Sequence, residues 1–94
     1  MREAATADAK RVMVARWNLT PDETAAIEQQ DPQWIKPLAI SLRLSALLGD
    51  DMVSELRYLA APRERFLGWS ARTVIANRSN GLDQVMEMVE SETP

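Results

Sequence analysis

Helix start and stop signals recur at short intervals along this chain and limit it to short helices. Thr20, Pro21 and Glu23 form a capping box: the threonine caps a helix, the proline suits its first position and the glutamate bonds back to the cap. Asp31 and Pro32 repeat the combination of capping residue and proline. Further signals stand at Pro37, Gly49, Asp50, Asp51, Pro62, Ser70 and Gly81. Together they predict an all-α fold, a small bundle of five to six short helices.

Apolar residues between these signals follow helical spacing. We expect helices over about residues 3–17, 21–30, 37–48, 52–60, 71–75 and 81–90. The side chains expected to face inward include Ile27, Trp34, Ile35, Leu38, Leu42, Met52, Val53, Leu56, Leu59, Leu82, Val85, Met86 and Val89. Met88 lies off the stripe of the last helix, so it is expected to be exposed if that stripe is buried.

The composition excludes several kinds of chemistry. The chain has no Cys and no His, which excludes disulfides, thiolate nucleophiles, zinc sites of the usual kind and histidine bases. It also lacks a glycine-rich phosphate loop and a paired arrangement of carboxylates. We therefore expect no enzyme activity, no cofactor and no metal. The chain begins without a signal peptide and has no run near the ~20 apolar residues of a membrane span, which predicts a cytoplasmic protein with no membrane partner.

Charge is distributed unevenly along the chain. The formal net charge is −3, but residues 57–78 hold five arginines and one glutamate, and residues 79–94 hold four acids and no base. An acidic chain is poorly suited to bind DNA without sequence preference, because that affinity comes from neutralised phosphates. The basic and acidic stretches can instead face each other or a partner of opposite sign. A chain of 94 residues has a thin core, which favours a homo-oligomer, in the simplest case a dimer.

Two capped segments meet near Asp31, in the order that a helix-turn-helix motif requires. Gln33 and Lys36 are the plausible DNA-contacting residues before Pro37 intervenes. An ordinary helical corner explains the same pattern, so both interpretations stay open.

Bulky apolar side chains, Phe66, Leu67 and Trp69, occupy a connection between helices, where polar residues are the norm. They can pack into the core, or they can anchor a partner, since Trp and Arg dominate binding hot spots and Trp69 lies near Arg65 and Arg72. The surrounding arginines can equally form a solvated face with a few ion pairs.

The last helix combines apolar and acidic residues. It can be a frayed terminus, or a plug that inserts into a partner. In the second interpretation Met86, Met88 and Val89 supply apolar contact, and Glu87, Glu90 and Glu92 supply charge.

The order of several short motifs resembles a known family. The motifs are Arg43-Leu44, Leu47-Leu48-Gly49, Leu56-Arg57-Tyr58-Leu59, Pro62, Phe66-Leu67-Gly68-Trp69, Val74-Ile75, Asn80-Gly81, Val85, Met86 and Val89. They resemble the toxin-binding C-terminal domain of MbcA/ParS/Xre-type bacterial antitoxins. The upstream Trp17-Asn18-Leu19-Thr20 is similar to the start of the Xre-like helix-turn-helix that precedes this domain.

The resemblance implies an antitoxin of a type II toxin-antitoxin system, usually a homodimer. It would bind and occlude a cognate NAD-acting toxin of the RES or ADP-ribosyltransferase type. Residues 1–36 would form a degenerate helix-turn-helix-like region, and residues 37–94 the toxin-binding helical domain. The partner-binding residues that it implies are Gly68, Trp69, Arg72, Met86, Glu87 and Glu90. A DNA-binding transcriptional repressor and a helical interaction module without a toxin partner are the alternatives.

Overall fold

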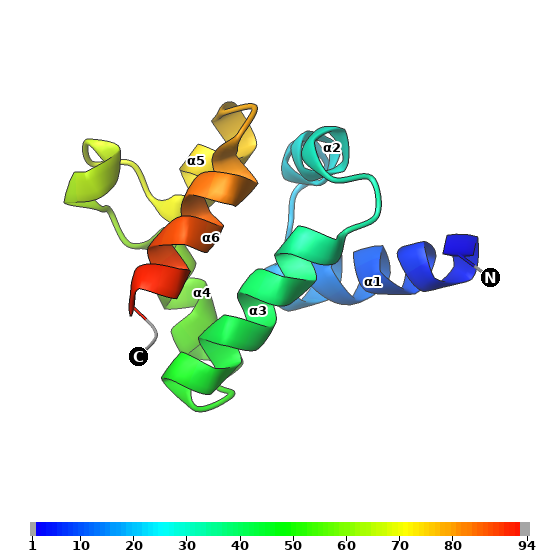
Figure 1. Ribbon diagram of the computed structural model, residues 1–94, viewed down its shortest axis with the longest axis horizontal. Coiled ribbons are helices and arrows are strands. Elements are labelled where there is room, and N and C mark those ends of the chain that lie inside the picture. The colour runs from blue at the N-terminus through cyan, green and yellow to red at the C-terminus, as the bar shows by residue number, and fades with distance from the viewer. Residues whose placement is uncertain (1, 93–94) are drawn as a thin grey trace.

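The computed structural model describes residues 2–92, with side chains placed for residues 8–92. The helices are α1 (Arg2–Trp17), α2 (Pro21–Gln30), α3 (Ile35–Leu48), α4 (Met52–Ala60), α5 (Ala71–Asn77) and α6 (Gly81–Glu92), with a 3-10 turn, η1 (Glu64–Phe66), between α4 and α5 (Figure 1). Within this range the chain contains no strand, only an isolated bridge between Pro62 and Ser70. The predicted all-α fold is confirmed.

Local capping signals define most helix ends as predicted. The Thr20 hydroxyl accepts a hydrogen bond from the Glu23 amide at 3.2 Å, and the Glu23 carboxylate accepts one from the Thr20 amide at 2.9 Å. Ser70 caps α5 by accepting from the Thr73 amide at 3.1 Å. Gly49 ends α3 in the left-handed conformation, with φ +79°.

The start of α3 differs from the prediction. The helix begins at Ile35, two residues before Pro37. Amides of the first helical turn have no partner within the helix, so a proline is tolerated there. The Asp31 carboxylate accepts from the Lys36 amide at 2.6 Å and fixes this turn. The predicted boundary at residue 36 therefore falls inside α3, and the division into two functional regions stays a prediction.

Helix α6 lies against both α3 and α5, while α2 packs on α5, α4 packs on α3 and α5, and α1 packs on α3. Figure 1 shows the N-terminal end of α1 projecting away from the other helices. The largest side chains of the core are Met13, Trp17, Ile27, Trp34, Ile40, Leu44, Leu59, Phe66, Leu82 and Met88.

Several inward-facing predictions are wrong. Ile35, Leu42, Met52 and Val53 are exposed to solvent. Helix α3 buries the face that carries Pro37, Ile40, Ser41 and Leu44, and α4 buries Glu55 and Leu59. Met88, expected to be exposed, is buried, because α6 is covered by α3 on one side and by α5 on another.

The junction of α2, α5 and α6 is unusually close. The Gln30 side chain donates to the Ile75 carbonyl at 2.7 Å and accepts from the Leu82 amide at 2.8 Å. Gly81 lies directly on the backbone of α5, so that a Cβ at this position would stand 2.3 Å from the Val74 carbonyl oxygen. The backbones of α5 and α6 are therefore in direct contact, and the Gln30 side chain connects α2 to both.

No helix within residues 2–92 has the length and apolar character needed to cross a bilayer.

Candidate partner-binding surface

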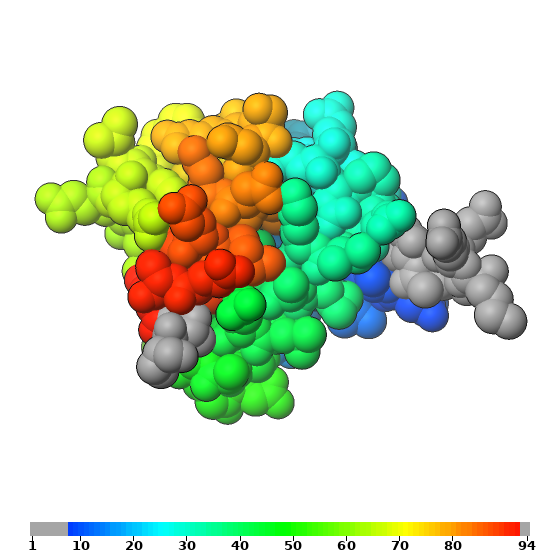
Figure 2. Space-filling model, viewed as in Figure 1, coloured from blue at the N-terminus to red at the C-terminus, as the bar shows by residue number. Residues whose placement is uncertain are grey.

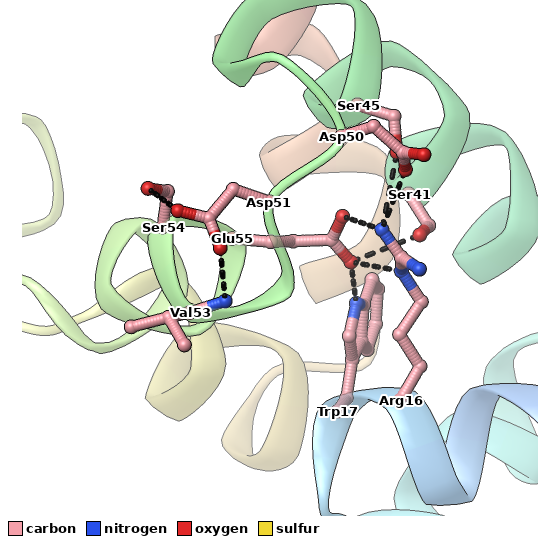
Figure 3. A network of polar contacts seen from close by, with 9 residues as sticks. All are labelled: Arg16, Trp17, Ser41, Ser45, Asp50, Asp51, Val53, Ser54 and Glu55. Atoms are coloured by element: carbon pink, nitrogen blue, oxygen red, sulfur yellow. Dashed lines mark hydrogen bonds and ion pairs between the residues drawn. The ribbon is translucent and has the colours of Figure 1, made fainter.

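A buried polar cluster joins α1, α3 and α4 (Figure 3). The Glu55 carboxylate is 1% exposed and accepts two hydrogen bonds of 3.0 Å from the Arg16 guanidinium. It also accepts from Trp17 Nε1 at 2.6 Å and from Ser41 Oγ at 2.9 Å. The hydrogen bonds with Glu55 raise the pKa of Arg16 above its ordinary value, against the opposing effect of burial. Side chains of α1 and α3 thus donate four hydrogen bonds to this carboxylate and connect these helices to α4.

The connection between α4 and α5, residues 61–70, is a closed loop that we call the corner. The Arg63 amide donates to the Trp69 carbonyl at 3.1 Å, and the Gly68 amide donates to the Arg63 carbonyl at 2.8 Å. Phe66 is buried and fixes the loop to the core. Backbone bonds and one buried ring therefore set the shape of the corner before any partner arrives.

Leu67 lies at the tip of the corner and is 89% exposed. Its φ is +56°, in the left-handed region that costs an L-residue roughly 1–2 kcal/mol. Neither core packing nor backbone preference therefore accounts for a leucine here. In Figure 2 the yellow-green residues of this region project from one side of the molecule.

Gly68 and Trp69, two of the predicted partner-binding residues, follow the tip. Gly68 has φ +93° and open space around its missing side chain. Trp69 is 43% exposed, and the Arg78 guanidinium lies 5.3 Å from the centroid of its ring. Of the corner's predicted alternatives, core packing holds for Phe66, while Leu67 and Trp69 remain available to a partner.

Arg72, also predicted to contact a partner, is occupied within the protein. Its guanidinium donates to the Glu23 carboxylate at 2.6 and 2.9 Å and to the Asn18 carbonyl at 2.6 Å. These bonds connect α5 to α2 and to the end of α1. The hydrogen bonds from Arg72 hold the pKa of Glu23 below its ordinary value, although burial acts in the opposite direction.

This lowered pKa of Glu23 predicts a loss of stability in acid. The folded state favours the ionised carboxylate, so the stabilisation is present above the unfolded pKa, near 4.5, and is lost as pH falls through the lower folded pKa. Glu23→Gln should lower the free energy of unfolding by about 1.5 kcal/mol at pH 7 and by less below pH 4. Chemical denaturation over this pH range measures the difference. Asp22→Asn, at an exposed neighbouring acid without an ion pair within residues 8–92, is the control; an equal pH dependence in both variants would contradict the assignment.

The predicted residues of α6 divide between core and surface. Met86 is half-buried against the core, and Glu87 is exposed. Glu90 is also exposed and forms an ion pair with Arg43 of α3 at 3.6 Å. The plug interpretation is wrong for Met88 and Val89, which are buried within the protein.

The predicted DNA-contacting residues do not share one helix face. Gln33 is exposed in the turn before α3, whereas Lys36 lies in the first turn of α3. The Lys36 ammonium forms an ion pair with Asp83 of α6 at 2.7 Å, and this contact raises the pKa of Lys36.

Among the described residues, no group of three carboxylates is spaced to hold a metal ion. Comparisons with protein-family models, with curated proteins and with solved structures found no match to this chain.

The backbone of Leu67 provides a test that separates stability from binding. Leu67→Gly should raise the free energy of unfolding by about 0.5–1 kcal/mol, because relief of the left-handed penalty exceeds the added entropy of the unfolded chain. Leu67→Ala keeps the backbone penalty and should stay close to the parent protein. Urea denaturation monitored by circular dichroism compares the three chains. A glycine variant that is no more stable than the alanine variant would show that the tip is unstrained.

Proposed function

We propose that this protein is an antitoxin that binds a cognate NAD-acting toxin through the corner and the adjoining end of α6, and thereby occludes the toxin. The observation that carries the proposal is Leu67, a large apolar side chain that is 89% exposed on a loop fixed by its own hydrogen bonds. Exposed apolar groups on preorganised loops favour association, because little conformational entropy remains to be lost on binding.

The corner and α6 form a continuous surface. The Arg65 guanidinium donates to Ser91 Oγ near the end of α6 at 3.4 Å. The Tyr58 hydroxyl, at the base of the corner, donates to the Glu92 carboxylate. Glu87 lies about one turn before Ser91 and Glu90 directly before it, so they can border a partner that covers Leu67 and Trp69.

The class of toxin follows from the resemblance of the motifs to MbcA/ParS/Xre-type antitoxins, with a RES or ADP-ribosyltransferase type of enzyme as the partner. Such a partner acts on NAD in the cytoplasm. Arg72 and Met86 would contribute indirectly, by supporting the corner and α6, since each is already packed within the protein.

Co-expression with the toxin encoded beside this gene tests the proposal. The parent chain should restore growth and the cellular NAD concentration. Leu67→Ala combined with Trp69→Ala should lose this protection, while Leu42→Ala, at a leucine of α3 that is 67% exposed, should keep it. Continued NAD loss in the presence of equal amounts of the folded parent chain would refute the antitoxin function. Removal of α6 is unsuitable as a test, because α6 belongs to the core.

The proposed antitoxin is a homodimer, as the small core of the chain suggests. Sedimentation velocity at several concentrations tests this part separately, and a monomer at every concentration would refute it. The ion pair of Lys36 with Asp83 leaves the repressor alternative less well supported, since one of its two DNA-contacting residues is engaged.

A further inference from the structure

The arginines around the corner differ from most other basic residues of the protein, although Arg57, exposed on α4, also has no ion pair within residues 8–92. Elsewhere in residues 8–92, each lysine and arginine up to Arg43 has a carboxylate partner, as does Arg72. Arg63, Arg65 and Arg78, which lie on or against the corner, form no ion pair within the same range. Their guanidinium groups therefore have no direct carboxylate partner within residues 8–92, and Glu64 is the one acidic residue of the corner itself.

Neutral groups hold these arginines in place. The Arg63 guanidinium lies 4.1 Å from the centroid of the Tyr58 ring and donates to the Tyr58 carbonyl at 2.8 Å. Arg78 lies over Trp69 and donates to the Gln84 side chain at 3.0 Å. A cation held by rings and amides keeps its full charge and loses little side-chain entropy when a carboxylate binds it.

Leu67 and the nearby arginines together indicate which chemical groups a partner of the corner must carry. Leu67 requires an apolar socket, and guanidinium groups prefer carboxylates or phosphates as bidentate partners. The net charge of −3 opposes approach to nucleic acid and to anionic lipid, both of which present extended arrays of phosphate. Discrete carboxylates beside an apolar pocket match a loop that carries an exposed leucine together with arginines, and a protein surface can supply such a pocket.

We propose that the corner docks into an apolar socket rimmed by Asp or Glu side chains on a partner protein. The inference rests on the proposed function, because the toxin is the protein expected to carry this socket. The recognition chemistry can nevertheless be tested without the toxin.

The test is a selection from a phage-displayed random peptide library on the full immobilised chain. Enriched peptides should carry an apolar residue flanked by Asp or Glu. Their affinity should fall about tenfold for Leu67→Ala and about tenfold again for Arg65→Gln with Arg78→Gln. Leu42→Ala, with a comparably exposed leucine on α3, should bind as the parent does.

Three outcomes overturn the inference. The first is that the selected peptides lack acidic residues. The second is that the Leu67 variants bind the peptides as tightly as the parent chain does. The third is that duplex DNA or phosphatidylserine vesicles bind to the chain in a way that depends on the corner. The Leu67→Gly variant guards against misfolding as an explanation, because it is expected to be more stable than the parent chain while losing the tip. A toxin complex that survives all corner substitutions would refute the inference and leave the antitoxin function intact. If acidic peptides bind the corner but the chain does not protect against the toxin, the inference would stand and the antitoxin function would be refuted.

Discussion

Glu55→Ala should lower the free energy of unfolding by about 3–5 kcal/mol, a large part of the roughly 5–15 kcal/mol of a typical domain. The substitution removes the acceptor of four hydrogen bonds, including both bonds of 3.0 Å from Arg16. It would leave an indole N–H and a hydroxyl without their acceptor, and the half-buried Arg16 guanidinium with only Ser45 and Asp50 as partners, which is costly. Thermal and urea denaturation measure the loss.

Two further variants define the cause. Glu87→Ala removes an exposed carboxylate and should change stability by less than about 0.5 kcal/mol. Combining Glu55→Leu with Arg16→Met and Trp17→Phe removes both charges and every donor but the Ser41 hydroxyl, and should recover part of the loss, since apolar replacements of buried ion pairs are often tolerated. A small effect of Glu55→Ala alone would show that water enters and replaces the carboxylate.

Gly81→Ala should destabilise the protein by about 3 kcal/mol, the upper end for overpacking. Alanine normally stabilises a helix relative to glycine by about 1 kcal/mol, so the expected sign is reversed. The added Cβ would stand 2.3 Å from the Val74 carbonyl oxygen and 2.7 Å from the Ile75 Cα. Both are backbone atoms, which cannot move aside by a change of rotamer, so α5 and α6 would have to separate.

Gly49→Ala is the matched control for Gly81→Ala. Gly49 has open space around it, and only its positive φ of +79° opposes a side chain. Its replacement should cost about 1 kcal/mol, less than that of Gly81. Denaturation curves for both variants decide the comparison; a more stable Gly81→Ala protein would show that α5 and α6 do not pack this closely.

The helix ends could be read from the sequence because they depend on neighbouring residues. The capping box of Thr20 and Glu23, the cap at Ser70 and the stop at Gly49 need no knowledge of the tertiary structure. The start of α3 was misplaced because a proline at the third helical position satisfies the same local rules as one at the first.

The buried faces were predicted less well, because they depend on distant partners. Periodicity alone favoured Met52 and Val53 over Glu55 as the inward residues of α4. Glu55 can be buried because Arg16 and Trp17 donate to it. These two residues lie 39 and 38 positions earlier in the chain. Met88 was misplaced because a helix packed on two sides buries a wider arc than a single stripe indicates.

At the candidate site, the sequence pointed to the corner but could not distinguish its members. Phe66, Leu67 and Trp69 look alike as apolar residues, yet only the backbone geometry turns Phe66 inward and Leu67 outward. Arg72 was grouped with the other arginines because its carboxylate partner, Glu23, lies 49 residues away.

The three tryptophans differ in their access to solvent, and this gives the protein a built-in optical reporter. Trp17 and Trp34 are buried, whereas Trp69 is 43% exposed on the corner. Iodide or acrylamide should therefore quench the fluorescence of Trp69 far more than that of the other two. A partner bound at the corner would shield Trp69, so a decrease in this quenching would report binding directly, without an attached dye.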